Sequence, residues 1–180
     1  DKAVVVDDEG LRGSGALVTA KVLAAAIEGL DADLVITGTE STDGYTGVVP
    51  QQLAALLGLP AVTFARKVEL ADGTLSVERI SANGYDDVTC PLPALVAVTS
   101  GAVEPRYPTF KGIMAAKSKP IERPSAAELG FDAAAIGTAG SGQEIKSVTA
   151  APSRAAGHKV VDEGEAYLAI VEMLEKAKVI

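Results

Sequence analysis

The chain contains very little histidine, cysteine or tryptophan. It has one histidine, one cysteine and no tryptophan among its 180 residues. Because His158 and Cys90 each stand alone, the sequence indicates neither a Ser–His–Asp nor a Cys–His arrangement, and neither residue has companions at zinc-ligand spacing. We expect His158 in an exposed arm and Cys90 as a small buried hydrophobe. A single cysteine cannot form an internal disulfide, which favours a reducing cytosol.

Positive charge and long apolar runs are scarce as well. The chain carries 16 Lys and Arg against 24 Asp and Glu, a net charge of −8, which argues against a nucleic-acid binder. No apolar run approaches the roughly 20 residues that a membrane-spanning helix requires. An initiating methionine is absent and Asp1 stands directly before a strand pattern, so we expect a fragment or a processed chain. What is present, 180 residues with 48% hydrophobic content, suffices for one domain with a real core.

The most informative stretch is a strand, a polar turn and a helix in succession. Residues 34–36 read as a buried strand that stops at Gly38, and residues 51–58 have the apolar spacing and terminal glycine of a short helix. In the turn between them, Gly44 and Gly47 let the backbone approach a bound group without an intervening Cβ. Because backbone N–H groups at a helix start attract anions, the stretch predicts an anion-binding loop. An ordinary strand-to-helix loop with a capping side chain stays open as the alternative.

The first half of the chain alternates strands and helices. We expect a buried parallel strand at residues 3–6 and a helix at residues 17–30 capped by Ser14, followed by the strand at residues 34–36. This order implies a parallel sheet with right-handed crossovers. The spacing then changes and predicts a hairpin turning at Asp72-Gly73 and a mixed sheet, with strands at residues 61–64, 67–70, 74–80, 85–90 and 92–98.

The second half is less periodic. Residues 101–124 are rich in Pro, Lys and Gly. Ser125 and Glu128 have the spacing of a capping box and predict a short helix. Residues 131–158 are expected to form an extended arm, and residues 163–178 an amphipathic helix. An arm followed by such a helix is hard to bury in one small domain, which indicates docking on a partner.

Two sequence blocks resemble parts of the β subunit of electron-transfer flavoproteins. The nucleotide loop of that subunit, with the approximate pattern G-x-x-x-x-D-G-x-T-G-x-V-P, is similar to residues 38–60, GTESTDGYTGVVPQQLAALLGLP. Its partner-recognition loop is similar to residues 104–117, EPRYPTFKGIMAAK. The blocks stand in the right order, and the resemblance covers the whole chain. The family also has an N-terminal segment with the first strands of the domain, so we expect this chain to be truncated there.

The resemblance implies an electron carrier subunit rather than an enzyme. The implied fold is α/β, adenine-nucleotide α-hydrolase-like or flavodoxin-like, with a parallel-core sheet, helices on both faces, an antiparallel hairpin addition and an extended C-terminal arm. It divides the chain into a nucleotide-binding domain at residues 1–124, with a partner-recognition loop at 98–120, and an arm and helix at 125–180 that dock on the α subunit. The α subunit would hold most of the FAD, while this chain would close over the isoalloxazine and bury AMP. Electrons would pass from flavin dehydrogenases, such as acyl-CoA dehydrogenases, to a membrane quinone oxidoreductase, in the bacterial cytoplasm or the mitochondrial matrix.

The resemblance also assigns candidate site residues. The implied phosphate cradle is Asp43, Gly44, Tyr45, Thr46 and Gly47, and the approach to it is lined by Gly38, Thr39, Glu40, Ser41 and Thr42. The family often has a small acidic residue in place of Tyr45, so this ring either crowds the phosphate or points to solvent. The implied partner-binding residues are Glu104, Pro105, Arg106, Tyr107, Pro108, Thr109, Phe110, Lys111, Gly112, Ile113 and Met114. Phe110 is the expected anchor in a partner's pocket, with a plain solvated linker as the alternative.

Other functions stay open at this point. A stand-alone ATP- or AMP-binding domain of the universal-stress type, or an adenylating enzyme of the same architecture, also has a glycine turn after a strand. The former normally shows a further G-x-x-G motif, which residues 137–142 match poorly. The loop could instead hold a second FAD, as in electron-bifurcating relatives, or belong to a structural subunit that binds nothing.

Overall fold

The computed structural model describes residues 2–153, 157 and 159–180. They form two compact units, Asp1–Glu144 and Ile145–Ile180. The domain boundary expected after residue 124 therefore lies inside the first unit. None of the helices in the described part of the chain has the length and apolar character that a membrane span requires.

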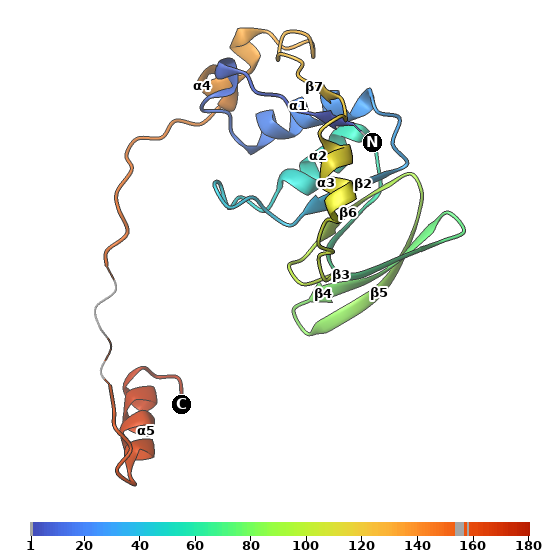
Figure 1. Ribbon diagram of the computed structural model, residues 1–180. Helices are drawn as coiled ribbons and strands as arrows, with labels where there is room; N and C mark the ends of the chain where they lie inside the picture. The colour runs from blue at the N-terminus through green and yellow to red at the C-terminus, as the bar shows by residue number, and fades with distance from the viewer. Residues whose placement is uncertain (1, 154–156, 158) are drawn as a thin grey trace. The chain divides into compact units, whose positions relative to one another are not determined.

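A five-stranded mixed sheet is the larger of the two sheets in the described residues (Figure 1). Its strands lie in the order β2-β6-β3-β4-β5. β6 pairs in parallel with β2 on one side and with β3 on the other, whereas β4 pairs antiparallel with both β3 and β5. The strands are β2 (Leu34–Gly38), β3 (Ala61–Ala71), β4 (Thr74–Ser81), β5 (Gly84–Pro91) and β6 (Ala94–Val98). The predicted parallel core with a hairpin addition is confirmed.

The hairpin turn lies where the sequence predicted it. Asp72 and Gly73 have φ angles of 48° and 72°, the left-handed pair that suits a two-residue hairpin. The two strands expected before this turn are one long strand, β3, which passes through two register shifts. Its residue Phe64 has a φ of 58°, as at a bulge, and bulges bend a strand.

Helices α1 (Ala16–Glu28) and α2 (Val49–Leu57) pack against one face of the sheet. Their contact buries five residues, Ala24, Val35, Leu53, Ala54 and Leu95. A second cluster gathers residues of β3, β4, β5 and β6, and it includes Cys90, which is buried as expected. The α/β class with helices flanking a mixed sheet is thereby confirmed. α2 ends at Gly58, whose φ of 66° is the left-handed cap that the sequence predicted.

The N-terminal segment differs from the prediction. β1 spans only Ala3–Val4, is not buried, and pairs in parallel with the short strand β7 (Ile121–Glu122) instead of joining the main sheet. A 3-10 turn, η1 (Glu9–Leu11), follows. Ser14 does not cap α1, whose N-cap is Gly15; the Ser14 hydroxyl accepts a hydrogen bond from the N–H of Gly137 at 3.0 Å. The Ser14 side chain, which local spacing predicted as a helix cap, thus makes a long-range hydrogen bond instead.

The prediction of an extended arm at residues 131–158 is wrong for residues 131–144. Residues 131–144 contain η2 (Ala133–Ala135) and α4 (Gly137–Ser141), and they belong to the first unit. Ala126 and Ile136 form a third buried cluster with two residues of α1, Val18 and Val22. The capping box is present, because Glu128 accepts from the N–H of Ser125 while the Ser125 hydroxyl accepts from the N–H of Glu128. It closes a turn, however, not a helix.

The second unit contains the predicted terminal helix, α5 (Ala166–Lys176). The carboxylate of Asp162 accepts hydrogen bonds from the N–H groups of Gly164 and Ala166 at the start of this helix. Its large apolar side chains Tyr167, Leu168, Ile170, Val171 and Met173 are exposed. His158, expected in the arm, lies outside the described residues.

Candidate functional site

The carboxyl ends of the parallel strands lie at one edge of the sheet and are tied together by threonine side chains. Thr39, directly after β2, donates its hydroxyl to the carbonyl of Val98 on β6 at 3.1 Å. Thr99, directly after β6, donates both its N–H (2.9 Å) and its hydroxyl (3.1 Å) to the carbonyl of Ala65 on β3. In open α/β sheets, ligands bind beyond this edge. Two segments leave the sheet here, the loop at residues 39–48 and the segment that follows Thr99.

The loop folds around the carboxylate of Asp43. This carboxylate accepts hydrogen bonds from the Ser41 hydroxyl and from the N–H of Gly44, and the N–H of Tyr45 donates to the carbonyl of Ser41 at 3.0 Å. The Ser41 hydroxyl first, and then the N–H groups of Gly44 and of Asp43 itself, hold the pKa of Asp43 below its ordinary value of 3.8. Asp43 therefore stays ionised and fixes the turn.

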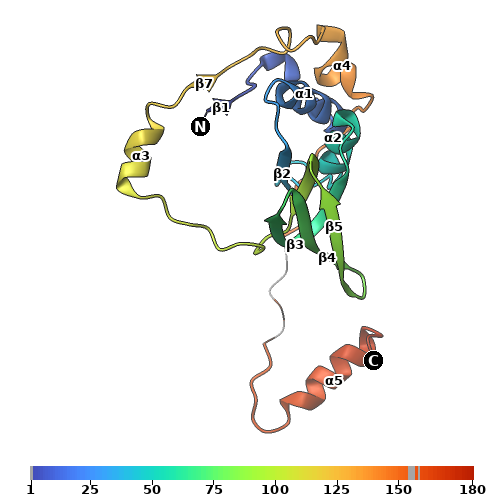
Figure 2. The same ribbon diagram turned by 90° about the vertical axis from the view of Figure 1, so that its right-hand side faces the viewer.

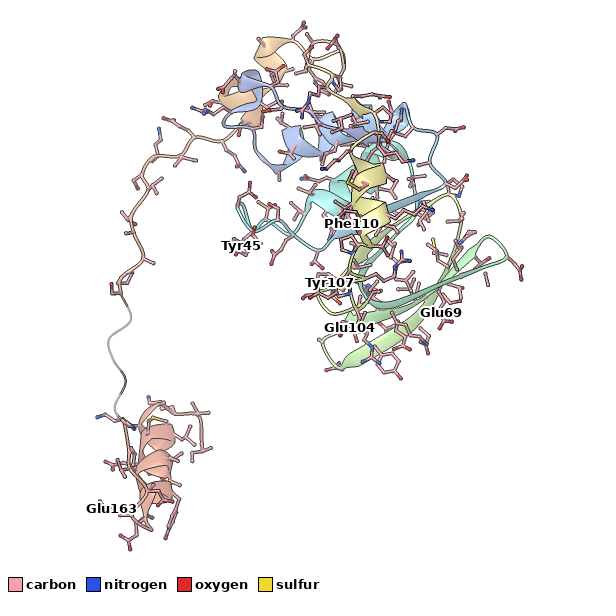
Figure 3. The ribbon with its side chains drawn as sticks, viewed as in Figure 1. Tyr45, Glu69, Glu104, Tyr107, Phe110 and Glu163 are labelled. Atoms are coloured by element: carbon pink, nitrogen blue, oxygen red, sulfur yellow. The ribbon has the colours of Figure 1, made fainter. Side chains whose placement is uncertain are left out.

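Tyr45 lies at the outer end of the loop (Figure 3). Its side chain is 66% exposed. The sequence left two positions open for this ring, against the phosphate or in solvent, and the structure has the ring in solvent. Tyr45 and Gly47 both have left-handed backbone conformations, with φ angles of 47° and 62°. For a tyrosine this conformation is uncommon and is tolerated mostly in tight turns.

The predicted cradle residues are brought together, but some of their donors are already used inside the loop. The N–H groups of Gly44 and Tyr45 point to loop oxygens. The Glu40 carboxylate lies beside Gly47, 3.4 Å from the place where a Cβ of residue 47 would stand. Two carboxylates, Glu40 and Asp43, thus belong to the loop itself. A phosphate would be drawn away from them, toward the start of α2.

The start of α2 offers unused polar groups. Within the described residues no side chain caps its first turn. Pro50 has no N–H, so the free donors there are the N–H groups of Val49 and Gln51, at the positive end of the helix dipole. Gln51, with its amide nitrogen turned toward the loop as the surrounding acceptors require, donates to the carbonyls of Gly47 and Val48 at 3.3 and 3.2 Å. This contact holds the loop against the helix that it precedes.

Two buried polar atoms flank the loop and have no partner among the described residues. They are the hydroxyl of Thr37, next to the end of β2, and the side-chain carbonyl of Gln52, in the first turn of α2. Leaving such an atom unsatisfied costs about 1–3 kcal/mol, so sites of this kind usually receive a polar group. The donor and acceptor set fits a nucleotide better than a bare anion, because a sugar or base supplies hydroxyl and amino groups. The sequence interpretation missed Thr37 and Gln52, whose only signal was a polar side chain at each end of the loop.

The second candidate surface stands on the excursion between β6 and β7. In Figure 2 the chain leaves the sheet after β6, runs out to helix α3 (Phe110–Ala116) and returns to β7 beside β1. Every residue from 103 to 123 is exposed, including all the predicted partner-binding residues. Glu104, Tyr107 and Phe110 follow one another along this excursion (Figure 3). Tyr107 is 95% and Phe110 79% exposed, which is unusual for large apolar side chains.

Phe110 does not lie in a loop, as expected, but opens helix α3. Thr109 is the N-cap: its hydroxyl accepts from the N–H of Gly112 at 3.1 Å and its carbonyl from the N–H of Ile113 at 2.9 Å. Helical spacing places Ile113 and Met114 on the same side as Phe110. Phe110, which looks like an isolated aromatic in the sequence, is thus the first residue of an apolar helical face.

Fold and site together define a class of protein: an α/β domain with a glycine-bearing loop at the carboxyl edge of its parallel strands and an exposed apolar helix on an excursion from the same edge. The described residues contain no cluster of side chains suited to a metal ion. The chain belongs to the electron transfer flavoprotein domain family, whose model matches residues 1–129.

Curated relatives match along the whole chain. The protein "Electron transfer flavoprotein subunit beta" of Mycobacterium tuberculosis (strain CDC 1551 / Oshkosh) is 41% identical over 181 residues, which cover all of this chain and 68% of the relative. The protein of the same name from Megasphaera elsdenii is 32% identical over 191 residues, covering all of this chain and 71% of the relative. The resemblance drawn from the two sequence blocks is confirmed, and with it a role in electron transport in a flavoprotein.

Proposed function

We propose that this chain acts as the β subunit of a heterodimeric electron-transfer flavoprotein. In this role it binds AMP at residues 38–47 and helps to enclose an FAD held mostly by the α subunit. It passes electrons from flavin dehydrogenases, such as acyl-CoA dehydrogenases, to a membrane quinone oxidoreductase. It is an electron carrier subunit and not an enzyme, in keeping with the single histidine and single cysteine of its sequence.

The observation that carries the nucleotide assignment is the pair of unpartnered buried atoms beside an uncapped helix. Thr37 stands next to the end of β2 and Gln52 in the first turn of α2, and the N–H groups and dipole at the start of this helix favour a phosphate. The AMP phosphate would be held at the first turn of α2 and by the backbone at Thr46 and Gly47. The sugar and base would satisfy Thr37 and Gln52. Asp43 and Gln51 would keep the loop shape, without contacting the ligand.

FAD supplies the redox chemistry when it is bound, and this chain contributes binding and docking. The surface proposed for docking is residues 104–114, whose exposed apolar side chains suit a pocket on a dehydrogenase. Residues 145–180, with the exposed apolar side chains of α5, are proposed to dock on the α subunit. The name of these relatives, subunit beta, supports a heterodimer.

The experiment is to release and identify the bound nucleotides. The complete β subunit is purified with its α subunit and denatured, and the released nucleotides are identified by ultraviolet spectrum and mass. We expect one AMP and one FAD per heterodimer. Two FAD molecules would favour the electron-bifurcating alternative, ATP without FAD the universal-stress alternative, and FAD alone would contradict the nucleotide site.

A further inference from the structure

The N-terminal residues 2–8 hold the returning end of the excursion that carries α3. The N–H of Ala3 donates to the carbonyl of Pro120 at 3.0 Å, and the N–H of Val5 to the carbonyl of Glu122 at 2.9 Å. The ammonium of Lys2 forms an ion pair with the Glu122 carboxylate at 2.9 Å. β1 and β7 thus pair in parallel and lie side by side in both views (Figures 1 and 2). We call this pair of strands the clamp.

The outgoing end of the excursion is held by hydrogen bonds as well. Thr99 makes two hydrogen bonds to the carbonyl of Ala65 on β3. Between this anchor and the clamp, every residue from 103 to 119 is exposed, and α3 has no buried residue. A helix without a packed face depends for its position on the points where its segment is attached. The clamp therefore sets how far and in which direction Phe110 is presented.

We propose that Ala3 and Val5, through their backbone N–H groups, are positioning residues for docking by α3. This inference rests on the proposed function in that residues 104–114 are taken as the docking surface. With the clamp closed, the excursion is a short segment with two fixed ends, and little freedom is lost when α3 enters a partner's pocket. With the clamp open, the next attachment of the returning chain is at Ala126, which is held by the Asp8 carboxylate, and a longer free segment must be ordered on docking.

Strand geometry provides a matched control for the experiment. Ala3 and Val5 turn their N–H groups toward β7, whereas alternation along a strand turns that of Val4 the other way. Proline removes the N–H and still tolerates extended backbone. Ala3→Pro and Val5→Pro therefore open the clamp, and Val4→Pro makes the same chemical change at the residue between them.

The measurement is the rate of flavin reduction in the complete heterodimer, titrated with a purified acyl-CoA dehydrogenase that is kept reduced by its acyl-CoA. For Ala3→Pro and Val5→Pro we expect the half-saturating dehydrogenase concentration to rise about three- to tenfold, as after losing one or two anchoring hydrogen bonds. The rate at saturation should stay unchanged, because the flavin is untouched. Val4→Pro should match wild type. Hydrogen exchange of amides 110–116, followed by mass spectrometry, should be faster in the two clamp variants alone.

The ion pair between Lys2 and Glu122 allows a second test, in which a charge swap should restore docking. Lys2→Glu should raise the half-saturating concentration about twofold, as befits an exposed pair, and adding Glu122→Lys should restore it. The inference is overturned if the clamp variants dock like Val4→Pro, if the saturating rate falls with the affinity, or if the charge swap fails to restore docking. These failures are separate from a failure of the docking surface, because the latter would appear as normal docking by Phe110→Ala.

Discussion

The carboxylate of Asp8 accepts a hydrogen bond of 2.9 Å from the backbone N–H of Ala126, a residue 118 positions further along the chain. The same carboxylate accepts a hydrogen bond of 2.8 Å from the N–H of Gly10. Ala126 is buried in the cluster that also contains Val18, Val22 and Ile136. One side chain thus joins the N-terminal segment to the third core cluster, immediately after the clamp that holds the docking excursion.

Asp8 is expected to make stability depend on pH. The N–H of Ala126 first, and then that of Gly10, lower the pKa of Asp8 from its ordinary value of 3.8. Because the folded pKa is the lower one, the stabilisation is complete above the unfolded pKa of about 3.9 and is lost as pH falls through the folded pKa. Asp8→Asn should therefore lower the thermal midpoint at neutral pH, and its difference from wild type should shrink below about pH 4. Thermal unfolding followed by circular dichroism checks this.

The neighbouring carboxylate provides the control for that pH series. Asp7→Asn removes the same charge from the adjacent residue, for which the structure gives no hydrogen bond, and should leave the midpoint nearly unchanged. A difference between wild type and Asp8→Asn that persists undiminished at pH 3 would contradict the role given to the ionised carboxylate.

Gly137, the first residue of α4, is expected to be more sensitive to substitution than Gly142, the residue that follows this helix. Its φ is 60°, and an added Cβ would lie 2.5 Å from the carbonyl oxygen of Gly10. Gly142 has a similar φ of 64° but open space around it. Gly142→Ala should cost only the left-handed backbone strain, about 1–2 kcal/mol, whereas Gly137→Ala should add an overpacking cost of about 1–3 kcal/mol. Urea unfolding of the two variants measures the difference, and equal losses would contradict the close approach of α4 to the N-terminal segment.

The elements that could be predicted from the sequence are those whose signals are local. Asp72 and Gly73 have the turn residues that a two-residue hairpin demands, and Gly58 is the residue that a left-handed helix cap demands. The loop between β2 and α2 could also be predicted from local signals, because its glycines lie next to the strand and the helix in the sequence. Ser125 and Glu128 were paired correctly by spacing alone.

The features that could not be predicted depend on contacts between distant segments. Ser14 looks like a helix cap, but its hydroxyl serves Gly137, 123 positions away. Residues 3–6 look like a buried strand of the sheet, but β1 pairs with a short strand at residues 121–122. Thr37 and Gln52 show no motif, and only the folded chain reveals that their polar atoms are buried without partners among the described residues.

The nucleotide loop is expected to depend on the backbone of Gly47. At a φ of 62°, a valine is strained whatever the space around it, so Gly47→Val should distort the loop beside the start of α2. We expect less than half of the wild-type AMP to co-purify with the complete heterodimer. Stability should fall both by about 1–3 kcal/mol of strain and by the loss of ligand stabilisation. Released nucleotide is quantified by chromatography and compared with the unfolding midpoint.

A second glycine separates strain from ligand loss. Gly73 in the β3–β4 hairpin has a φ of 72° and open space around it, so Gly73→Val imposes similar strain far from the loop in sequence. This variant should lose stability and keep its AMP. If Gly47→Val keeps full AMP occupancy, the phosphate does not lie at this turn.

Phe110 is expected to be the anchor of the docking surface. Its ring is 79% exposed at the start of α3, with Ile113 and Met114 on the same helical side. Burying such a ring in a partner's pocket contributes about 1.5–3 kcal/mol, and truncating an anchor of this kind typically costs about 2 kcal/mol or more. Phe110→Ala should therefore raise the half-saturating dehydrogenase concentration about thirtyfold. The flavin spectrum and the AMP content should stay unchanged, because every residue of α3 is exposed and Phe110 lies outside the loop at residues 39–48.

Val103→Ala is the matched control for Phe110→Ala. It stands on the same excursion, is 77% exposed, and lies outside both the proposed docking residues and the helix. If exposure of apolar area on this segment were enough for docking, Val103→Ala and Phe110→Ala would weaken electron uptake in proportion to the area removed. If the helix start is the anchor, Val103→Ala docks normally and only Phe110→Ala shifts the titration. An unchanged titration for Phe110→Ala would show that the dehydrogenase docks elsewhere, and α3 would then be a solvated linker held at both ends.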